Sequence, residues 1–169
     1  MKKNIEVVLL GDSIIARGDW NKLLEKEHLL NLGIDGDTTK GVLERIDLIK
    51  NIEPKTIVLM IGVNDLCLSI PLDEVFENYK KILKILQESN ANILVNGIFI
   101  TQMPAVNKKV LKLNSMIEEY CKKNSLKFLD LNESFENEKK LLKENLTTDG
   151  LHLGQAAYKA WAYKLNSLI

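Results

Sequence analysis

The residues best suited to chemistry in this 169-residue chain fall in four short segments. These are Gly11-Asp12-Ser13, the glycine-containing residues 33–39, Asn64-Asp65 and Asp149-Gly150-Leu151-His152. A serine hydroxyl becomes a useful nucleophile when a neighbouring imidazole takes its proton, and a carboxylate can orient that imidazole. Backbone N–H groups and an asparagine amide can stabilise the anionic oxygen that forms on attack. The four segments together would therefore permit acyl transfer.

Each segment also has an ordinary structural interpretation. Ser13 could cap the helix that follows it. Gly33 and Gly36 could serve a tight turn, and Asp149-Gly150 is a strong turn signal. A lone histidine such as His152 is more often structural than catalytic. Their joint placement on one predicted edge favours a functional site. Three further aspartates are interpreted as loop and cap formers, namely Asp12, Asp37 and Asp65.

Five short apolar runs bounded by turn residues predict the strands that position these segments. Longer amphipathic stretches separate most of the runs, so the pattern predicts right-handed crossovers and a parallel sheet covered by helices on both faces. In such sheets the functional groups gather beyond the carboxyl ends of the strands. The predicted strands are Ile5 to Leu10, Leu29 to Leu32, Thr56 to Ile61, Asn92 to Ile98 and Lys127 to Leu131.

Apolar residues at three- and four-residue spacing predict three of the covering helices. The last of these helices follows Gly154 and is expected to dock on the core. The three apolar faces are Val75, Tyr79, Ile82, Leu83 and Leu86; Val110, Leu113, Ile117, Tyr120 and Cys121; and Tyr158, Trp161, Ala162, Leu165 and Leu168.

At the same four segments the chain resembles the SGNH hydrolases, also called the GDSL esterase/lipase family. Gly11-Asp12-Ser13-Ile14 resembles the nucleophile block, with isoleucine in place of leucine. Asn31-Leu32-Gly33 with Gly36-Asp37-Thr38-Thr39 resembles the glycine block, especially in members related to the platelet-activating-factor acetylhydrolase catalytic subunits. Gly62-Val63-Asn64-Asp65 resembles the asparagine block and Asp149-Gly150-Leu151-His152-Leu153 the terminal one.

The resemblance implies a flavodoxin-like three-layer α/β/α fold with strand order 2-1-3-4-5. It also implies metal-free ester hydrolysis, with catalytic serine, glycine, asparagine and histidine at the quoted positions. The order 2-1-3-4-5 makes strands two, one and three neighbours, so that their loops meet around Ser13. Strand five would lie three spacings from strand one, roughly 14 Å at about 4.8 Å each. The segment from Asn132 to Leu151 must then bring His152 back to Ser13.

The residue chemistry supports these roles. The chain has two histidines. His28 begins predicted strand two, at the end of the sheet away from the site, which leaves His152 as the general base. Asp149 precedes His152 by three residues and can accept a hydrogen bond from its ring. The expected oxyanion donors are the backbone N–H groups of Ser13 and Gly33 and the amide of Asn64.

Composition bounds the other possibilities. The length fits one domain over residues 1–169, and 46% hydrophobic with 27% charged residues is ordinary for a soluble globular protein. Lys plus Arg and Asp plus Glu both number 23, so attraction for nucleic acid is not expected. The segment Met1 to Leu10 fits neither a signal peptide nor a membrane span, and the two cysteines favour a cytoplasmic setting. No cofactor, metal or membrane partner is expected, and the sequence does not fix an oligomeric state.

The favoured function is hydrolysis of short-chain esters, acetyl esters above all, with O-acetylated sugars among the candidates. Acyl transfer to an alcohol through the same acyl-enzyme is an alternative that sequence cannot separate. A non-enzymatic module binding phosphate or nucleotide is a third, although the chain has none of the usual phosphate-binding glycine motifs. Met103, within residues 100–106, could line the acyl pocket, or this apolar loop could simply pack on the core.

Overall fold

The computed structural model describes residues 4–169, so the first three residues of the segment considered as a leader lie outside the description. Within the described chain, five parallel strands form one sheet in the order β2-β1-β3-β4-β5, as predicted. Gly11 at the end of β1 pairs with Gly33 on one side and Met60 on the other, so three strands end level. The strands are β1 (Val7–Gly11), β2 (Leu29–Gly33), β3 (Thr56–Met60), β4 (Asn92–Asn96) and β5 (Lys127–Leu129).

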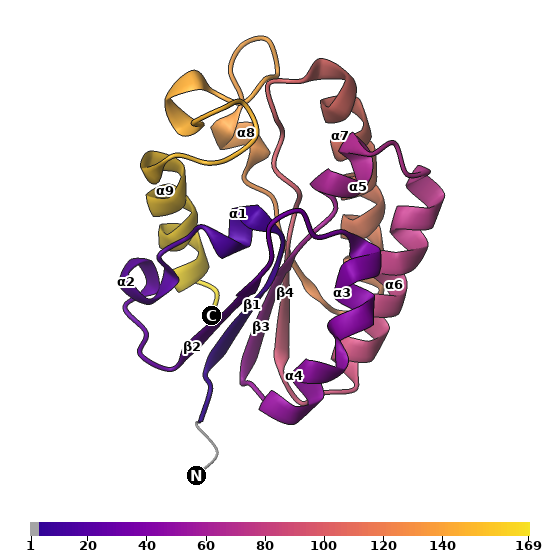
Figure 1. Ribbon diagram of the computed structural model, residues 1–169, viewed down its shortest axis with the longest axis vertical. Coiled ribbons are helices and arrows are strands. Elements are labelled where there is room, and N and C mark those ends of the chain that lie inside the picture. Colours follow the sequence, from indigo (N-terminus) through magenta and orange to yellow (C-terminus); the bar gives the residue numbers. More distant parts are fainter. Residues whose placement is uncertain (1–3) are drawn as a thin grey trace.

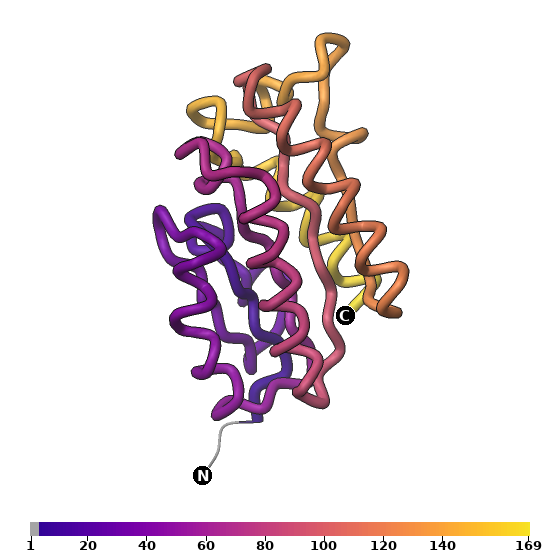
Figure 2. Tube along the Cα trace, turned by 90° about the vertical axis from the view of Figure 1, so that its right-hand side faces the viewer, coloured from indigo at the N-terminus to yellow at the C-terminus, as the bar shows by residue number. Residues whose placement is uncertain are grey.

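Helices cover both faces of this sheet and give the predicted three layers (Figure 1). One face carries α1 (Ser13–Ala16), α2 (Trp20–Leu24) and α9 (Gln155–Asn166). The other carries α3 (Thr39–Arg45), α4 (Asp47–Ile52), α5 (Val63–Cys67), α6 (Leu72–Gln87) and α7 (Pro104–Lys123), and Figure 2 looks onto this layer. The short elements α8 (Asn132–Phe135) and η1 (Glu144–Leu146) lie between β5 and α9 in the chain.

The strands form because their apolar runs are buried on both faces, as all five residues of β1 are. β4 ends two residues earlier than predicted, because at Ile98 side chains take the place of the backbone hydrogen bonds between strands. The Ile98 N–H donates to Asn114 Oδ1 (2.8 Å), and its carbonyl accepts from Asn114 Nδ2 (2.8 Å) and Asn132 Nδ2 (2.9 Å). β5 also ends two residues early, where Asp130 Oδ1 accepts the Asn132 N–H (2.8 Å) and starts a turn.

The predicted helix faces are buried with two exceptions. Tyr120 of α7 is only partly buried. Leu168 was expected on the apolar face of the last helix, but α9 ends at Asn166 and Leu168 is 37% exposed. None of the helices in residues 4–169 is both long enough and apolar enough to cross a membrane. The thiols of Cys67, which is exposed, and Cys121, which is buried, are free.

Aromatic rings fix α9 against α2 and the sheet. Trp161 lies edge-on to Trp20 (centroids 4.7 Å apart) and to Phe99 (4.9 Å). Its indole N–H donates to the side chain of Asn96 at the end of β4 (2.8 Å). The predicted docking helix is therefore anchored at the carboxyl ends of the strands.

Candidate active site

Ser13 is the first residue of α1, directly beyond the end of β1. Asp12 caps this helix, because its Oδ1 accepts the N–H of Ile14 (2.9 Å). Ser13 is therefore not the cap, which removes the structural interpretation considered for it. As the first helical residue, Ser13 keeps an N–H without an intrahelical acceptor. Its side chain is left to point into the site.

Two glycines let α1 sit close to the strands. A Cβ at Gly11 would lie 2.1 Å from the carbonyl oxygen of Met60, and one at Gly33 would lie 2.2 Å from the backbone nitrogen of Ala16. Neither space accommodates a side chain. The glycines at these strand ends thus serve the close approach that places Ser13 at the sheet edge.

The described structure brings His152 and Asp149 to Ser13. His152 Nε2 lies 3.0 Å from Ser13 Oγ, and His152 Nδ1 lies 2.7 Å from Asp149 Oδ2. Both distances are hydrogen-bond distances. With Nδ1 protonated, Nε2 is an acceptor for the Ser13 hydroxyl, which is the tautomer a general base requires.

The loop that carries His152 is held by its own side chains. Asp149 Oδ1 accepts the N–H groups of Leu151 (3.0 Å) and His152 (2.8 Å). Thr147 Oγ1 accepts the Gly150 N–H (2.9 Å) and donates to the His152 carbonyl (2.6 Å). Gly150 has φ +90°, a conformation that favours glycine. The imidazole is therefore oriented by a preformed turn.

The segment after β5 returns across the sheet edge by attaching to the loop that follows β4. The Leu142 N–H donates to the Thr101 carbonyl (3.1 Å), and the Gln102 N–H donates to the Gly150 carbonyl (2.8 Å). In Figure 1 this segment crosses above the sheet from α8 to α9. The Tyr158 hydroxyl of α9 then donates to the Ile14 carbonyl of α1 (2.6 Å), which ties the two ends of the site together.

Hydrogen bonds hold the pKa of Asp149 well below its usual value, at about 2. The largest cause is the His152 backbone N–H, followed by the His152 ring and the Leu151 N–H. The Asp149 side chain is half exposed (52%), so solvent screens the electrostatic part of this effect. Asp149 is ionised throughout the neutral range and can stabilise a protonated His152.

The structure argues against the role predicted for Gly33. The Gly33 N–H donates to Asn31 Oδ1 (2.9 Å), so it is already used. Gly36, at φ +77°, lies instead in a turn closed by the Asp37 N–H and the Ile34 carbonyl (3.1 Å). Asn64 Nδ2 donates to the Asp37 carbonyl (2.8 Å) and so lies beside this turn. Within residues 4–169 no hydrogen bond occupies the Gly36 N–H.

Two other predicted positions can be placed. His28 precedes β2 at the opposite end of the sheet, where its carbonyl accepts the Glu6 N–H (2.7 Å). Met103 precedes α7 and is 39% exposed, whereas Ile100 in the same loop is buried. The loop is thus partly core, and an acyl-binding role for Met103 stays a prediction.

Sequence reasoning missed Thr147, Tyr158 and Gly36 as contributors to the site. Thr147 follows the pattern of a turn-forming hydroxyl three residues before a glycine, a signal too common to single it out. Tyr158 was assigned only to the apolar face of α9. Gly36 was grouped with Gly33, and the choice between them depends on backbone dihedrals that the sequence does not contain.

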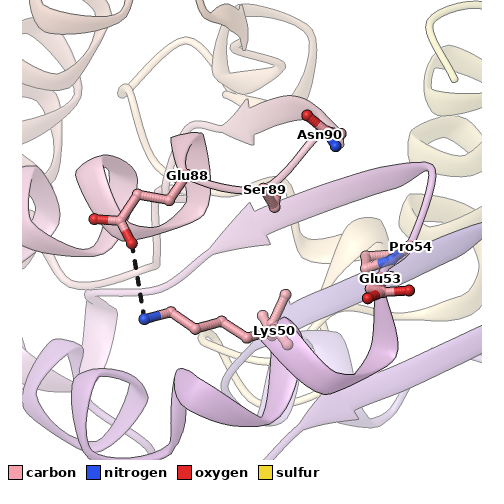
Figure 3. Close-up of a pocket in the computed structure, with 7 residues that line it drawn as sticks. Lys50, Glu53, Pro54, Glu88, Ser89 and Asn90 are labelled. Carbon is pink, nitrogen blue, oxygen red and sulfur yellow. Dashed lines mark ion pairs between the residues drawn. The ribbon is translucent and has the colours of Figure 1, made fainter.

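A hollow of about 620 Å³ lies away from these residues (Figure 3). It includes Pro54, just before β3, and Asn90, just before β4, and so lies at the amino ends of the strands. Lys50 and Glu88 form an ion pair there (3.7 Å). No triad-like arrangement lines this hollow. Among residues 4–169 no group of three or more His, Cys, Asp or Glu residues could hold a metal ion.

Comparison with known proteins places the chain in a family. The model of the GDSL-like lipase/acylhydrolase family matches residues 9–160. The chain belongs to this family, which consists of hydrolases that act on esters. The five-stranded order and the covering helices agree with the α/β fold of its solved relatives.

The sequence identity to individual relatives is modest. The chain is 30% identical over 152 residues to N-acylneuraminate cytidylyltransferase of Streptococcus agalactiae, covering 89% of this chain but only 35% of that protein. It is 28% identical to platelet-activating factor acetylhydrolase IB subunit alpha2 of Rattus norvegicus, covering 99% and 77%. A GDSL-like lipase of Bacteroides thetaiotaomicron shares the fold with TM-score 0.87 at 22% identity, covering 99% and 88%.

Proposed function

We propose that this chain is a serine esterase that hydrolyses short-chain esters, principally acetyl esters, through an acyl-enzyme on Ser13. The observation that supports it most is the hydrogen-bonded series from Ser13 Oγ to His152 Nε2 (3.0 Å) and from His152 Nδ1 to Asp149 Oδ2 (2.7 Å). In this proposal Ser13 is the nucleophile, His152 the general base and Asp149 the group that orients the ring.

The reaction has two halves. As Ser13 Oγ bonds to the ester carbonyl carbon, its proton moves to His152 Nε2 and the carbonyl electrons move to the oxygen. Collapse of this tetrahedral intermediate breaks the bond to the alcohol, which leaves with the proton from His152. A water molecule then gives its proton to His152 and attacks the acyl-enzyme. The second collapse releases the acid and returns the proton to Ser13.

The oxyanion needs donors in place before it forms. We assign this role to the Ser13 N–H and the Asn64 amide, as the sequence suggests, and to the Gly36 N–H instead of that of Gly33. Asn64 uses one amide hydrogen on the Asp37 carbonyl (2.8 Å), so its second hydrogen is free to donate. The same bond holds Asn64 next to the Gly36 turn.

The preference for acetyl esters is supported by the name of the Rattus norvegicus relative, an acetylhydrolase. The Streptococcus agalactiae relative is named for N-acylneuraminate, in which the acyl group is an amide, so O-acetylated sugars stay a candidate class to be screened. Its cytidylyl transfer is not assigned to this chain, because the match covers about a third of that protein.

The nucleophile is tested with Ser13→Ala and an activated aryl acetate. We expect turnover to fall by about 10³ to 10⁶ while circular dichroism and thermal unfolding stay unchanged. Mass spectrometry of the acid-quenched wild-type protein should find one acetyl group on the peptide that contains Ser13. Ser134→Ala serves as the matched control, because Ser134 is exposed and its hydrogen bonds in the described structure use only its backbone. Unchanged turnover in Ser13→Ala would overturn the assignment.

A further inference from the structure

The Asp12 carboxyl beside the nucleophile has one oxygen without a partner. Asp12 is 1% exposed, and its Oδ1 accepts the Ile14 N–H (2.9 Å). Within the described chain its Oδ2 is buried and has no hydrogen-bond partner. A buried carboxylate oxygen without a donor is costly, whereas a neutral carboxyl costs far less.

The groups around Asp12 offer no compensating charge. Arg45 of α3, which donates to the carbonyl of the adjacent Gly11 (3.1 Å), is paired with Asp37 (2.7 Å). Asp65 of α5 accepts from the hydroxyl (2.6 Å) and backbone (3.0 Å) of Thr39. His152 lies against the Ser13 hydroxyl (3.0 Å). Two tyrosines that interact with Asp12, Tyr79 of α6 and Tyr158 of α9, donate their hydroxyls to carbonyl oxygens.

These surroundings favour the protonated form. Burial is the largest cause and raises the pKa of Asp12 to about 7. The hydrogen bond from the Ile14 N–H lowers the pKa, and the negative charges of Asp37 and Asp65 raise it. Asp12 therefore changes charge near neutral pH.

We infer that Asp12 is a positioning residue that supports ester hydrolysis in its neutral form, and that its ionisation switches the reaction off. The uncharged carboxyl holds the first turn of α1 through Ile14 and so aims the Ser13 N–H at the developing oxyanion. When Asp12 is ionised, its negative charge is not screened by solvent and lies next to the site where the negatively charged oxyanion forms. The repulsion between the two raises the energy of the transition state.

This inference rests on the proposed esterase function, and its signature is the alkaline side of the pH profile. The profile of kcat/KM for an aryl acetate is measured from pH 5.5 to 9, with Ser13→Ala as the blank at each pH. We expect wild-type kcat/KM to fall about 10- to 100-fold above neutral pH. Asp12→Asn keeps an oxygen for the Ile14 N–H but cannot ionise, so its kcat/KM should stay level over the same range.

Asp35→Asn is the matched control, because this substitution in the neighbouring loop also removes one negative charge. Unlike Asp12, Asp35 has a side chain that is 64% exposed to solvent. Its profile should follow the wild type. If kcat/KM falls equally above neutral pH in the wild type and in Asp12→Asn, the inference is overturned while the esterase function stays intact. Absence of Ser13-dependent turnover in the wild type would instead overturn the proposed function.

A measurement without turnover keeps the inference testable if Asp12→Asn does not fold. The carboxyl carbon of Asp12 is followed by NMR in the Ser13→Ala protein, which lacks the nucleophile but keeps the Asp12 surroundings. We expect a titration midpoint near neutral pH. A midpoint close to that of an ordinary aspartate would overturn the inference whatever the kinetics.

Discussion

Replacing Asp149 by asparagine separates the two functions of this carboxylate. Its Oδ1 holds the backbone of the loop through Leu151 and His152, whereas its Oδ2 accepts the proton on His152 Nδ1. An asparagine oxygen can keep the backbone bonds of 3.0 and 2.8 Å. Its NH₂ group then takes the place of Oδ2 and meets Nδ1 at about the same position. Two donors would face each other unless the ring changes tautomer.

The changed tautomer places the ring proton on Nε2, 3.0 Å from Ser13 Oγ, so the lone pair that must accept the serine proton is lost. We expect kcat to fall by about 10³ to 10⁴, equivalent to roughly 4 to 5.5 kcal/mol of transition-state stabilisation. Because the loop bonds survive and Asp149 is half exposed, the free energy of unfolding should change by less than about 1 kcal/mol.

The assay is steady-state hydrolysis of an aryl acetate near pH 7.5, with urea unfolding on the same samples. Asp130→Asn is the matched control, because exposed Asp130 also accepts a backbone N–H, that of Asn132, far from Ser13. A kcat for Asp149→Asn within tenfold of the wild type would refute the idea that Asp149 sets the tautomer of His152.

The pH dependence of stability follows from the same carboxylate. The pKa of Asp149 is lowered in the folded state, so its stabilising contribution is present above the unfolded value of 3.8 and is lost as pH falls toward about 2. A loss of activity at higher pH would therefore not come from protonation of Asp149.

Three further outcomes are expected. Asn64→Ala should lower kcat by about 10² to 10³ if its amide faces the oxyanion, and a loss confined to KM would assign Asn64 to substrate binding instead. Gly150→Ala should destabilise the fold by about 1 to 2 kcal/mol in urea unfolding, because its φ of +90° is strained for alanine; an unchanged midpoint would contradict this. Rates across an acyl-length series of aryl esters should be highest for acetyl, and a maximum at octanoyl would refute the short-chain preference.

The sequence predicted the strands well because each is a continuous apolar run between turn residues. It overestimated β4 because Ile98 continues the apolar run, whereas its backbone is hydrogen-bonded by Asn114 and Asn132. Such long-range side-chain contacts have no local signal. The same limit applies to Leu168, which continues the helical spacing after the backbone of α9 has ended.

The candidate site was predictable as a set of residues, because Ser13, Asn64 and His152 each follow a recognisable pattern. The sequence also led us to expect that His152 returns to Ser13. The path of the returning segment was not predictable, since it depends on the hydrogen bond from the Gln102 N–H to the Gly150 carbonyl. Gly33 shows the opposite case. Its position at the end of β2 indicated that its N–H could donate to a substrate, but this N–H donates to the side chain of Asn31, two residues earlier.

The bond between Tyr158 and Ile14, together with the ring packing of Trp161 on Trp20, has a consequence for the order of folding. Ser13 and His152 are 139 residues apart in the chain, and the sheet strands β2 to β5 lie between them. Contacts of such wide sequence separation form late in folding. The contact between Ser13 and His152 is therefore expected to form only after the sheet and α9 have assembled.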